Sequence, residues 1–97
     1  MEIDHRFLLQ VLTSLASENE AAQLLDDLLT PREIDDLHLR MDIARRLYEG
    51  QTYEQIQLET RASSTTISRV RRALWRGAGG YHAVLSRLLP TRPTPRR

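Results

Sequence analysis

The sequence predicts a small all-α protein with about six helices. Apolar residues recur three or four positions apart along most of the chain, a spacing that places them on one face of a helix. Long runs of β-branched residues, which would favour strands, are absent. A content of 40% hydrophobic and 28% charged residues is typical of a globular domain. The 97 residues allow one domain, which we expect over residues 1–89, with a disordered Pro- and Arg-rich tail over residues 90–97.

The first two helices are expected over residues 2–16 and from residue 17 to the Thr30-Pro31 pair. Ser17 and Glu20 have the spacing of a capping box, in which two side chains satisfy backbone N–H groups that the first helical turn leaves without partners. Each helix carries one apolar stripe: Ile3, Phe7, Leu8, Val11, Leu12 and Leu15 in the first, and Ala21, Leu24, Leu25, Leu28 and Leu29 in the second.

The third helix is expected from Pro31 to about Glu49. Thr30 and Glu33 repeat the capping box around a proline at the first helical position, and Gly50 suits a left-handed C-terminal cap. Apolar residues occupy two faces: Ile34, Leu37, Met41, Ala44, Leu47 and Tyr48 on one, and Leu39 and Ile43 on another. Because the chain is too small to cover both faces, we expect a second subunit to cover one of them.

Two short helices follow, expected over residues 52–59 and 64–75. Thr52 and Gln55 form a further capping box, Ile56 and Leu58 are expected to face inward, and Ser63 caps the second helix. The segment between them is short enough to be a tight turn, so residues 52–75 are predicted to form a helix-turn-helix. After a glycine-rich break, a final amphipathic helix is expected over residues 81–89.

The charges divide sharply along the chain, although the total is only +1. Residues 1–60 hold all 13 acids and five arginines, a net charge of −8, whereas residues 61–97 hold nine arginines and no acid, a net charge of +9. Ordinary surface helices mix the two signs of charge. This asymmetry therefore predicts a surface that binds a polyanion rather than a merely solvated face.

The helix over residues 64–75 is predicted to enter the major groove of double-stranded DNA. With Ile67, Val70 and Leu74 facing inward, Thr65, Ser68, Arg69, Arg72 and Arg76 lie within about 50° of the outward direction. Arginine binds phosphate or guanine, and Ser or Thr hydroxyls bind phosphates or base edges. We predict that Ser64, Thr65, Ser68, Arg69 and Arg72 lie at the groove, that Thr52, Arg61, Arg71 and Arg76 lie nearer phosphates, and that Ser63 and Thr66 complete the DNA-binding set.

Several segments of the chain resemble one family of helix-turn-helix proteins. These segments are LTPRE (29–33) and its continuation to Arg40, LYEG (47–50), QTYEQI (51–56), ASSTTISR (62–69) and SRV (68–70). Together they resemble the tryptophan-repressor superfamily, especially its Trp-repressor-like branch, over about residues 25–75. The resemblance implies an intertwined homodimer whose core is built by the first three helices and the last one of both subunits. Its two helix-turn-helix units, here called reading heads, are expected about 34 to 36 Å apart.

The resemblance also implies where an effector would bind. Arg40 and Arg69 match the two arginines that clamp the corepressor in the tryptophan repressor, so a small-molecule corepressor is conceivable. Val70 replaces the glycine that leaves room for the indole, and tryptophan is therefore not expected. Arg61 stands where the family usually has glycine, so either the turn is altered or Arg61 tolerates a strained backbone to contact a phosphate.

Other kinds of function find little support in the sequence. The absence of cysteine excludes disulfides and thiolate chemistry. His38 and Asp42 have a spacing that suits a metal, but an ordinary surface pair is the favoured interpretation, and no catalytic arrangement is recognisable, so we expect neither a metal site nor an enzyme. No apolar run approaches the roughly 18 residues of a membrane span, and a soluble cytoplasmic protein is expected.

The leading hypothesis is a sequence-specific, DNA-binding transcriptional regulator that acts as a homodimer, with repression as the favoured outcome. The alternative is a protein-interaction adaptor that uses the same basic face on an acidic partner. The two hypotheses differ in one observable, because an adaptor would select no DNA sequence.

Overall fold

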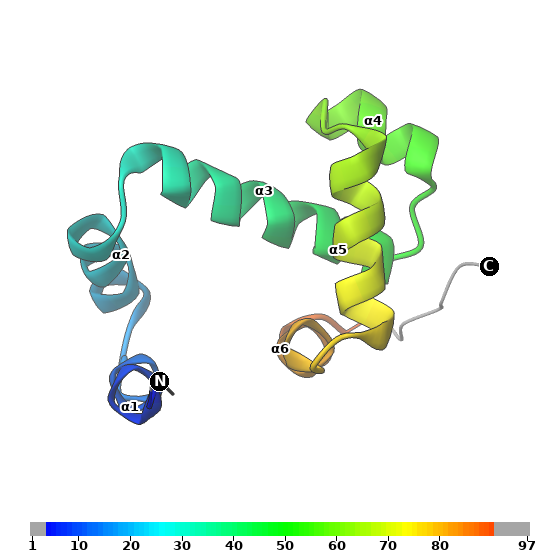
Figure 1. The fold of residues 1–97 in the computed structure, drawn as a ribbon. Coiled ribbons are helices and arrows are strands. Elements are labelled where there is room, and N and C mark those ends of the chain that lie inside the picture. Colours follow the sequence, from blue (N-terminus) through cyan, green and yellow to red (C-terminus); the bar gives the residue numbers. More distant parts are fainter. Residues whose placement is uncertain (1–3, 91–97) are drawn as a thin grey trace. The chain divides into compact units, whose positions relative to one another are not determined.

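The computed structural model describes residues 4–90, which form six helices and contain no strand. The helices are α1 (Arg6–Thr13), α2 (Glu18–Leu28), α3 (Pro31–Tyr48), α4 (Tyr53–Thr60), α5 (Ser64–Arg76) and α6 (Gly80–Leu88) (Figure 1). The predicted all-α class is therefore confirmed. Residues 91–97 of the predicted tail lie outside the described residues. The chain divides into two compact units, with the boundary after Ile34, and the prediction of one domain over residues 1–89 stays a prediction.

In the first unit, α1 is shorter at both ends than the apolar spacing predicts. It begins at Arg6, whose N–H donates to the Asp4 side chain, so residues 4 and 5 lie before the helix, and it ends at Thr13 instead of Ala16. The Thr13 hydroxyl donates to the carbonyl oxygens of Leu9 and Gln10, and the Ser14 hydroxyl donates to that of Val11 at 2.7 Å. Such bonds compete with the backbone hydrogen bonds that would continue a helix. The expected residues 2 and 3 of this helix lie outside the described residues.

The capping pairs of α2 and α3 form with one difference from expectation. Ser17 Oγ accepts the N–H of Glu20 as predicted, but the Glu20 carboxylate accepts the N–H of Ala16 at 2.9 Å, one residue before the cap. At α3, Thr30 Oγ1 accepts the N–H of Glu33, and Glu33 Oε1 accepts the N–H of Thr30. These bonds satisfy donors at the start of both helices and fix where each helix begins.

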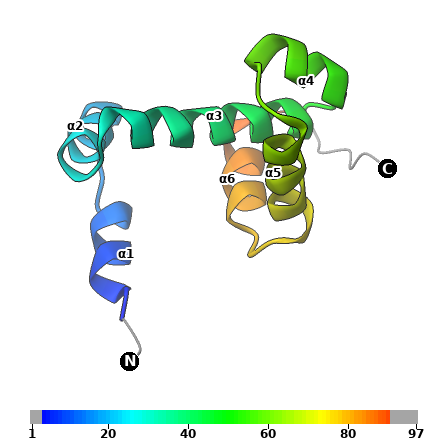
Figure 2. The same cartoon turned by 45° about the horizontal axis from the view of Figure 1, so that its top comes forward.

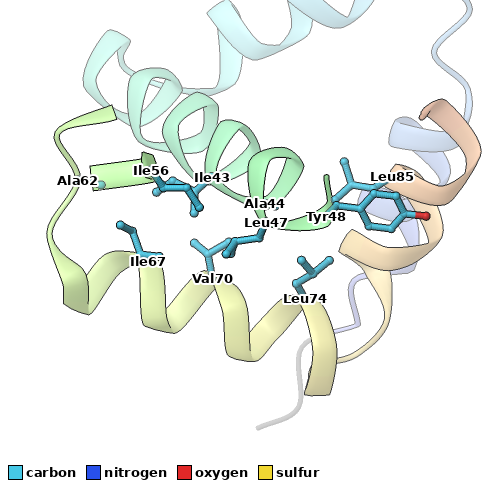
Figure 3. Close-up of a cluster of buried hydrophobic side chains, with 10 residues drawn as sticks. All are labelled: Ile43, Ala44, Leu47, Tyr48, Ile56, Ala62, Ile67, Val70, Leu74 and Leu85. Atoms are coloured by element: carbon cyan, nitrogen blue, oxygen red, sulfur yellow. The ribbon is translucent and has the colours of Figure 1, made fainter. Parts of the chain in front are cut away.

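The second unit holds the hydrophobic core, which α3, α4, α5 and α6 build together (Figure 3). In both overall views α5 lies beside α4 and α6 (Figures 1 and 2). The buried side chains come from all four helices and from the turn after α4: Ile43, Ala44, Leu47, Tyr48, Ile56, Ala62, Ile67, Val70, Leu74 and Leu85. Leu58 was expected to face this core, but it is 82% exposed. That expectation was wrong.

Helix α3 is buried only toward its C-terminal end. Ile43 and Leu47 are fully buried, whereas Leu37 and Met41 remain 41% and 39% exposed in the single chain. The helix ends at Tyr48, one residue before the expected Glu49, and Gly50 adopts the predicted left-handed cap with a φ of +92°. The N–H of Gly50 bonds the carbonyl oxygen of Leu47, and that of Gln51 bonds Arg46, both at 3.0 Å. This Schellman motif turns the chain toward α4.

Candidate nucleic-acid interface

Helices α4 and α5 form the predicted helix-turn-helix. Thr52 caps α4, because its side chain accepts the N–H of Gln55 and the Gln55 side chain accepts the N–H of Thr52 at 2.9 Å. In the turn, the Thr60 hydroxyl donates to the Ile56 carbonyl oxygen at 2.7 Å and accepts the N–H of Ala62 at 3.1 Å. These hydrogen bonds fix the start and end of α4, so the second helix leaves the turn in a defined direction.

Arg61 adopts the left-handed conformation that glycine would take more easily. Its φ is 63° and its ψ is 16°, and its N–H bonds the carbonyl oxygen of Gln57 at 2.9 Å. The turn is kept and the backbone of Arg61 is strained, as one of the two expectations for this residue requires, while its contact with a phosphate stays a prediction. A side chain in this conformation costs about 1 kcal/mol or more. Arg61 is exposed.

The first turn of α5 is held by two of the predicted DNA-binding residues. Ser63 Oγ accepts the N–H of Thr66 at 3.1 Å and lies 3.0 Å from the Thr66 hydroxyl. Ser63 is exposed and Thr66 is half-buried. Both hydroxyls thus define where α5 begins, and their contact with DNA stays a prediction.

The outward face of α5 brings five predicted residues together. Ile67, Val70 and Leu74 point into the core with exposures of 0%, 4% and 2% (Figure 3). On the other side of the helix, a surface hollow of about 360 Å³ is lined by Ser64, Thr65, Ser68, Arg69 and Arg72. All five are exposed, and they are the five residues that were predicted to lie at the DNA groove.

Four arginines of the predicted site keep their charges available. Arg61, Arg69, Arg72 and Arg76 are exposed, and none of them takes part in an ion pair within residues 4–90. Arg71 is placed differently: it is half-buried, and its Cζ lies 5.9 Å from the centre of the Tyr53 ring. It therefore lies on the flank of α5 that faces α4.

Tyr53 contacts one of the predicted DNA-binding residues, although no pattern in the sequence indicates this contact. It is the first residue of α4, and its hydroxyl donates to Ser68 Oγ at 3.2 Å. The ring is half-buried and packs against the core cluster. The two hydroxyls are 15 residues apart in the sequence, and no local spacing signals a contact that depends on how two helices pack.

The two arginines of the expected effector site also come together. Arg40 and Arg69 line a second hollow of about 330 Å³ with Thr66, Val70, Ala73 and Tyr81. This volume lies within the range of small-molecule pockets. Arg69 lines both hollows.

Asp42, which sequence spacing had paired with His38, binds two arginines instead. Its carboxylate accepts hydrogen bonds from Arg45 at 2.6 Å and Arg46 at 3.1 Å. Partial burial alone would raise the pKa of Asp42, but the hydrogen bonds and charges of Arg46 and Arg45 together hold it below its ordinary value. In the described part of the chain, no three His, Asp or Glu side chains are grouped to hold a metal ion.

The fold and this surface define a class of protein: a small all-helical protein with a helix-turn-helix whose second helix presents arginines and hydroxyls outward. Among residues 4–90, no helix combines the length and apolar character that crossing a membrane requires. The chain belongs to the Trp repressor protein family, whose profile matches residues 4–89. Membership of this family indicates a DNA-binding regulatory protein.

Individual relatives agree with this assignment. The chain is 42% identical over 90 residues to the uncharacterised protein YerC of Bacillus subtilis strain 168, covering 93% of this chain and 85% of YerC. A crystal structure of a candidate Trp repressor from Staphylococcus aureus superposes with a TM-score of 0.82 at 36% identity, covering 90% of this chain and 87% of the other. A TrpR-like protein from Eubacterium eligens gives a TM-score of 0.79 at 41% identity, with 86% of each chain covered. The expected Trp-repressor-like branch is thus confirmed.

Proposed function

We propose that the protein is a sequence-specific transcriptional regulator that binds double-stranded DNA as a homodimer and represses transcription. The observation that carries this proposal is the hollow on α5, where Arg69 and Arg72 lie beside three hydroxyls and take part in no ion pair within residues 4–90. Unpaired guanidinium groups release counterions from phosphates and can bind guanine at two atoms. Hydroxyls at the start of α5 add contacts to base edges.

The arginines around the hollow would position the reading head on the DNA backbone. Arg61 in the turn and Arg76 at the end of α5 are both exposed, and they extend the positive surface at the two ends of the helix. Phosphate contacts of this kind fix register and orientation, while base contacts select the sequence. Four further residues are proposed to support this surface: Thr52, Ser63, Thr66 and Arg71. Thr52 caps α4, Ser63 and Thr66 form the first turn of α5, and Arg71 lies over the Tyr53 ring on the flank of α5.

The homodimer is supported by apolar side chains that the single chain leaves exposed. Neither α1 nor α2 has a buried residue, and Phe7 and Leu9 of α1 are 75% and 57% exposed. In the second unit, a groove of about 540 Å³ is lined mainly by apolar side chains, including those of Met41, Tyr81 and Val84. Exposed apolar surface on this scale favours association. Light scattering at micromolar concentration should give twice the chain mass of 11.2 kDa; a monomer would contradict the dimer.

Selection from random duplex DNA tests the function itself. A homodimer with two reading heads should enrich a palindromic site with half-sites about one helical turn apart. Affinity for that site should fall steeply with salt, and the double variant R69A/R72A should both weaken binding and reduce the salt dependence. Enrichment of no sequence would favour the alternative, an adaptor that binds an acidic protein through the same face.

The second hollow is the proposed place for an effector. Two guanidinium groups, those of Arg40 and Arg69, suit the carboxylate of a small acidic metabolite. Val70 lines this hollow where the tryptophan repressor has glycine, and we therefore propose an effector other than tryptophan. Because the similar proteins come from bacteria, where the chromosome lies in the cytoplasm, we propose that the protein acts there.

A further inference from the structure

We propose that Tyr53 is a positioning residue that sets the base preference of the reading head by orienting the hydroxyl of Ser68. This inference rests on the proposed function and concerns a residue outside the predicted DNA-binding set. Tyr53 belongs to α4, the helix before the recognition helix, yet its hydroxyl reaches Ser68 Oγ in the hollow on α5.

The position of Tyr53 is fixed from both ends of the side chain. Its backbone follows Thr52, whose reciprocal hydrogen bonds with Gln55 fix the first turn of α4. Its ring is half-buried against the core cluster, and the Arg71 guanidinium lies 5.9 Å from the ring centre, within the range of a cation–π contact. The hydroxyl is therefore held at a fixed point beside Ser68 rather than sampling many rotamers.

A fixed donor beside Ser68 changes what that serine can offer to DNA. A serine hydroxyl has one hydrogen and two lone pairs, and it rotates to suit its partners. Because Tyr53 donates to Ser68 Oγ at 3.2 Å, one lone pair of that oxygen is occupied and its hydrogen must point elsewhere. Ser68 then keeps its hydrogen and a single lone pair for DNA, which favours Ser68 as a donor.

In the major groove a donor distinguishes base edges. Guanine N7 and O6, adenine N7 and thymine O4 accept hydrogen bonds, whereas the amino groups of cytosine and adenine donate them. A serine that rotates freely can bond to either kind of group. With one of its two lone pairs occupied by Tyr53, Ser68 should prefer an acceptor, and the reading head gains selectivity at one position in each half-site.

The test uses Y53F, which removes the hydroxyl and keeps the ring that packs against the core and Arg71. Selection on random DNA with the full chain should show that Y53F and S68A both relax the preference at the same half-site position, by about three- to tenfold, the worth of one hydrogen bond. The salt dependence should stay unchanged, because no charge is removed. The double variant Y53F/S68A should relax that position no further than S68A alone, because Tyr53 acts through Ser68.

Y48F is the matched control, because it also removes one tyrosine hydroxyl. Tyr48 lies in the core, where its ring stacks on Trp75. Y48F should keep the base preference of the wild type. Three results would overturn the inference: a Y53F preference identical to that of the wild type, an equal loss of affinity on every sequence, or an effect of Y53F that persists in the S68A background. If the wild-type protein itself enriches no sequence, the proposed function fails first, and the two failures are therefore distinguishable.

Discussion

Arg46 of α3 binds Glu59 at the end of α4, with 2.7 Å between Nη1 and Oε1. The same guanidinium donates to Asp42 one turn earlier on α3, and to the Gln51 side chain in the loop before α4. One side chain therefore ties α3 to both the loop that leads into α4 and the last turn of that helix. This network fixes how the helix-turn-helix is attached to α3.

Exchanging either partner of this ion pair should lower stability, and exchanging both should lower it by less than the sum. R46Q and E59Q each remove one charge, so the remaining partner loses its attraction in both single variants, and the double variant loses that attraction only once. Urea unfolding of the four proteins measures the coupling. It should shrink in 1 M NaCl, where charges are screened beyond about 3 Å. Strictly additive effects at low salt would show that the pair contributes nothing.

Stability should fall in acid through Asp42. The pKa of this carboxyl is held below its ordinary value of 3.8 by Arg46 and Arg45, which outweigh the opposing effect of burial. The unfolded chain therefore binds the proton more readily, and the stabilisation is present above about pH 5 and is lost as the pH falls through the folded pKa. Thermal melts should show D42N less stable than the wild type at pH 7, with a gap that closes toward acid pH. D27N, which changes an exposed carboxylate, should show no such pattern.

The helix starts were predictable from sequence because capping is a local interaction. Thr30 with Glu33, Thr52 with Gln55, and Ser63 with Thr66 are each three residues apart, so a pattern in the sequence suffices to find them. The inward and outward faces of α5 followed from the same local rule of 100° per residue. This rule identified four of the five residues that line the outer hollow, and Ser64 was predicted from its place at the start of the helix.

What the sequence could not supply were contacts between helices. The bonds from Tyr53 to Ser68 and from Arg46 to Glu59 span 15 and 13 residues, and they depend on the angle at which helices pack. The wrong expectation for Leu58 has a different cause. On α4 this residue lies about 200° from Ile56, which alone of that helix is buried, so the local rule of 100° per residue already places Leu58 on the outward side.

Gly77 should be required at the end of α5. A Cβ atom at this position would collide with the carbonyl oxygen of Ala73 in the last turn. G77A should therefore lower the free energy of unfolding by about 1 to 3 kcal/mol, as overpacking does elsewhere. G80A is the matched control, because a Cβ at Gly80 meets nothing within 4 Å, and it should be neutral or slightly stabilising. Equal melting temperatures for the two variants would contradict the collision.

Arg61 allows backbone strain and charge to be separated. R61G and R61A both remove the guanidinium, but only glycine adopts a φ of 63° without a steric penalty. We expect R61G to raise stability by up to about 1 kcal/mol and R61A to leave it nearly unchanged. Both should weaken DNA binding equally on all sequences and reduce the salt slope by about one per subunit. DNA affinity that differed between the two variants would show that Arg61 acts through the turn instead.

Variants of Arg40 and Arg69 should distinguish the roles that we propose for the two hollows. Arg69 lines both of them, whereas Arg40 lines only the second hollow, which we propose for an effector. In the absence of an effector, R69A should lower affinity for the selected site by about tenfold or more, as loss of a base contact does, and R40A should leave it within about twofold. Fluorescence anisotropy with labelled DNA at one salt concentration measures both. With a panel of small carboxylates, any compound that raises the melting temperature of the wild type should fail to do so for R40A. An equal loss of DNA affinity in the two variants would mean that Arg40 contacts DNA and that the second hollow is not a separate site.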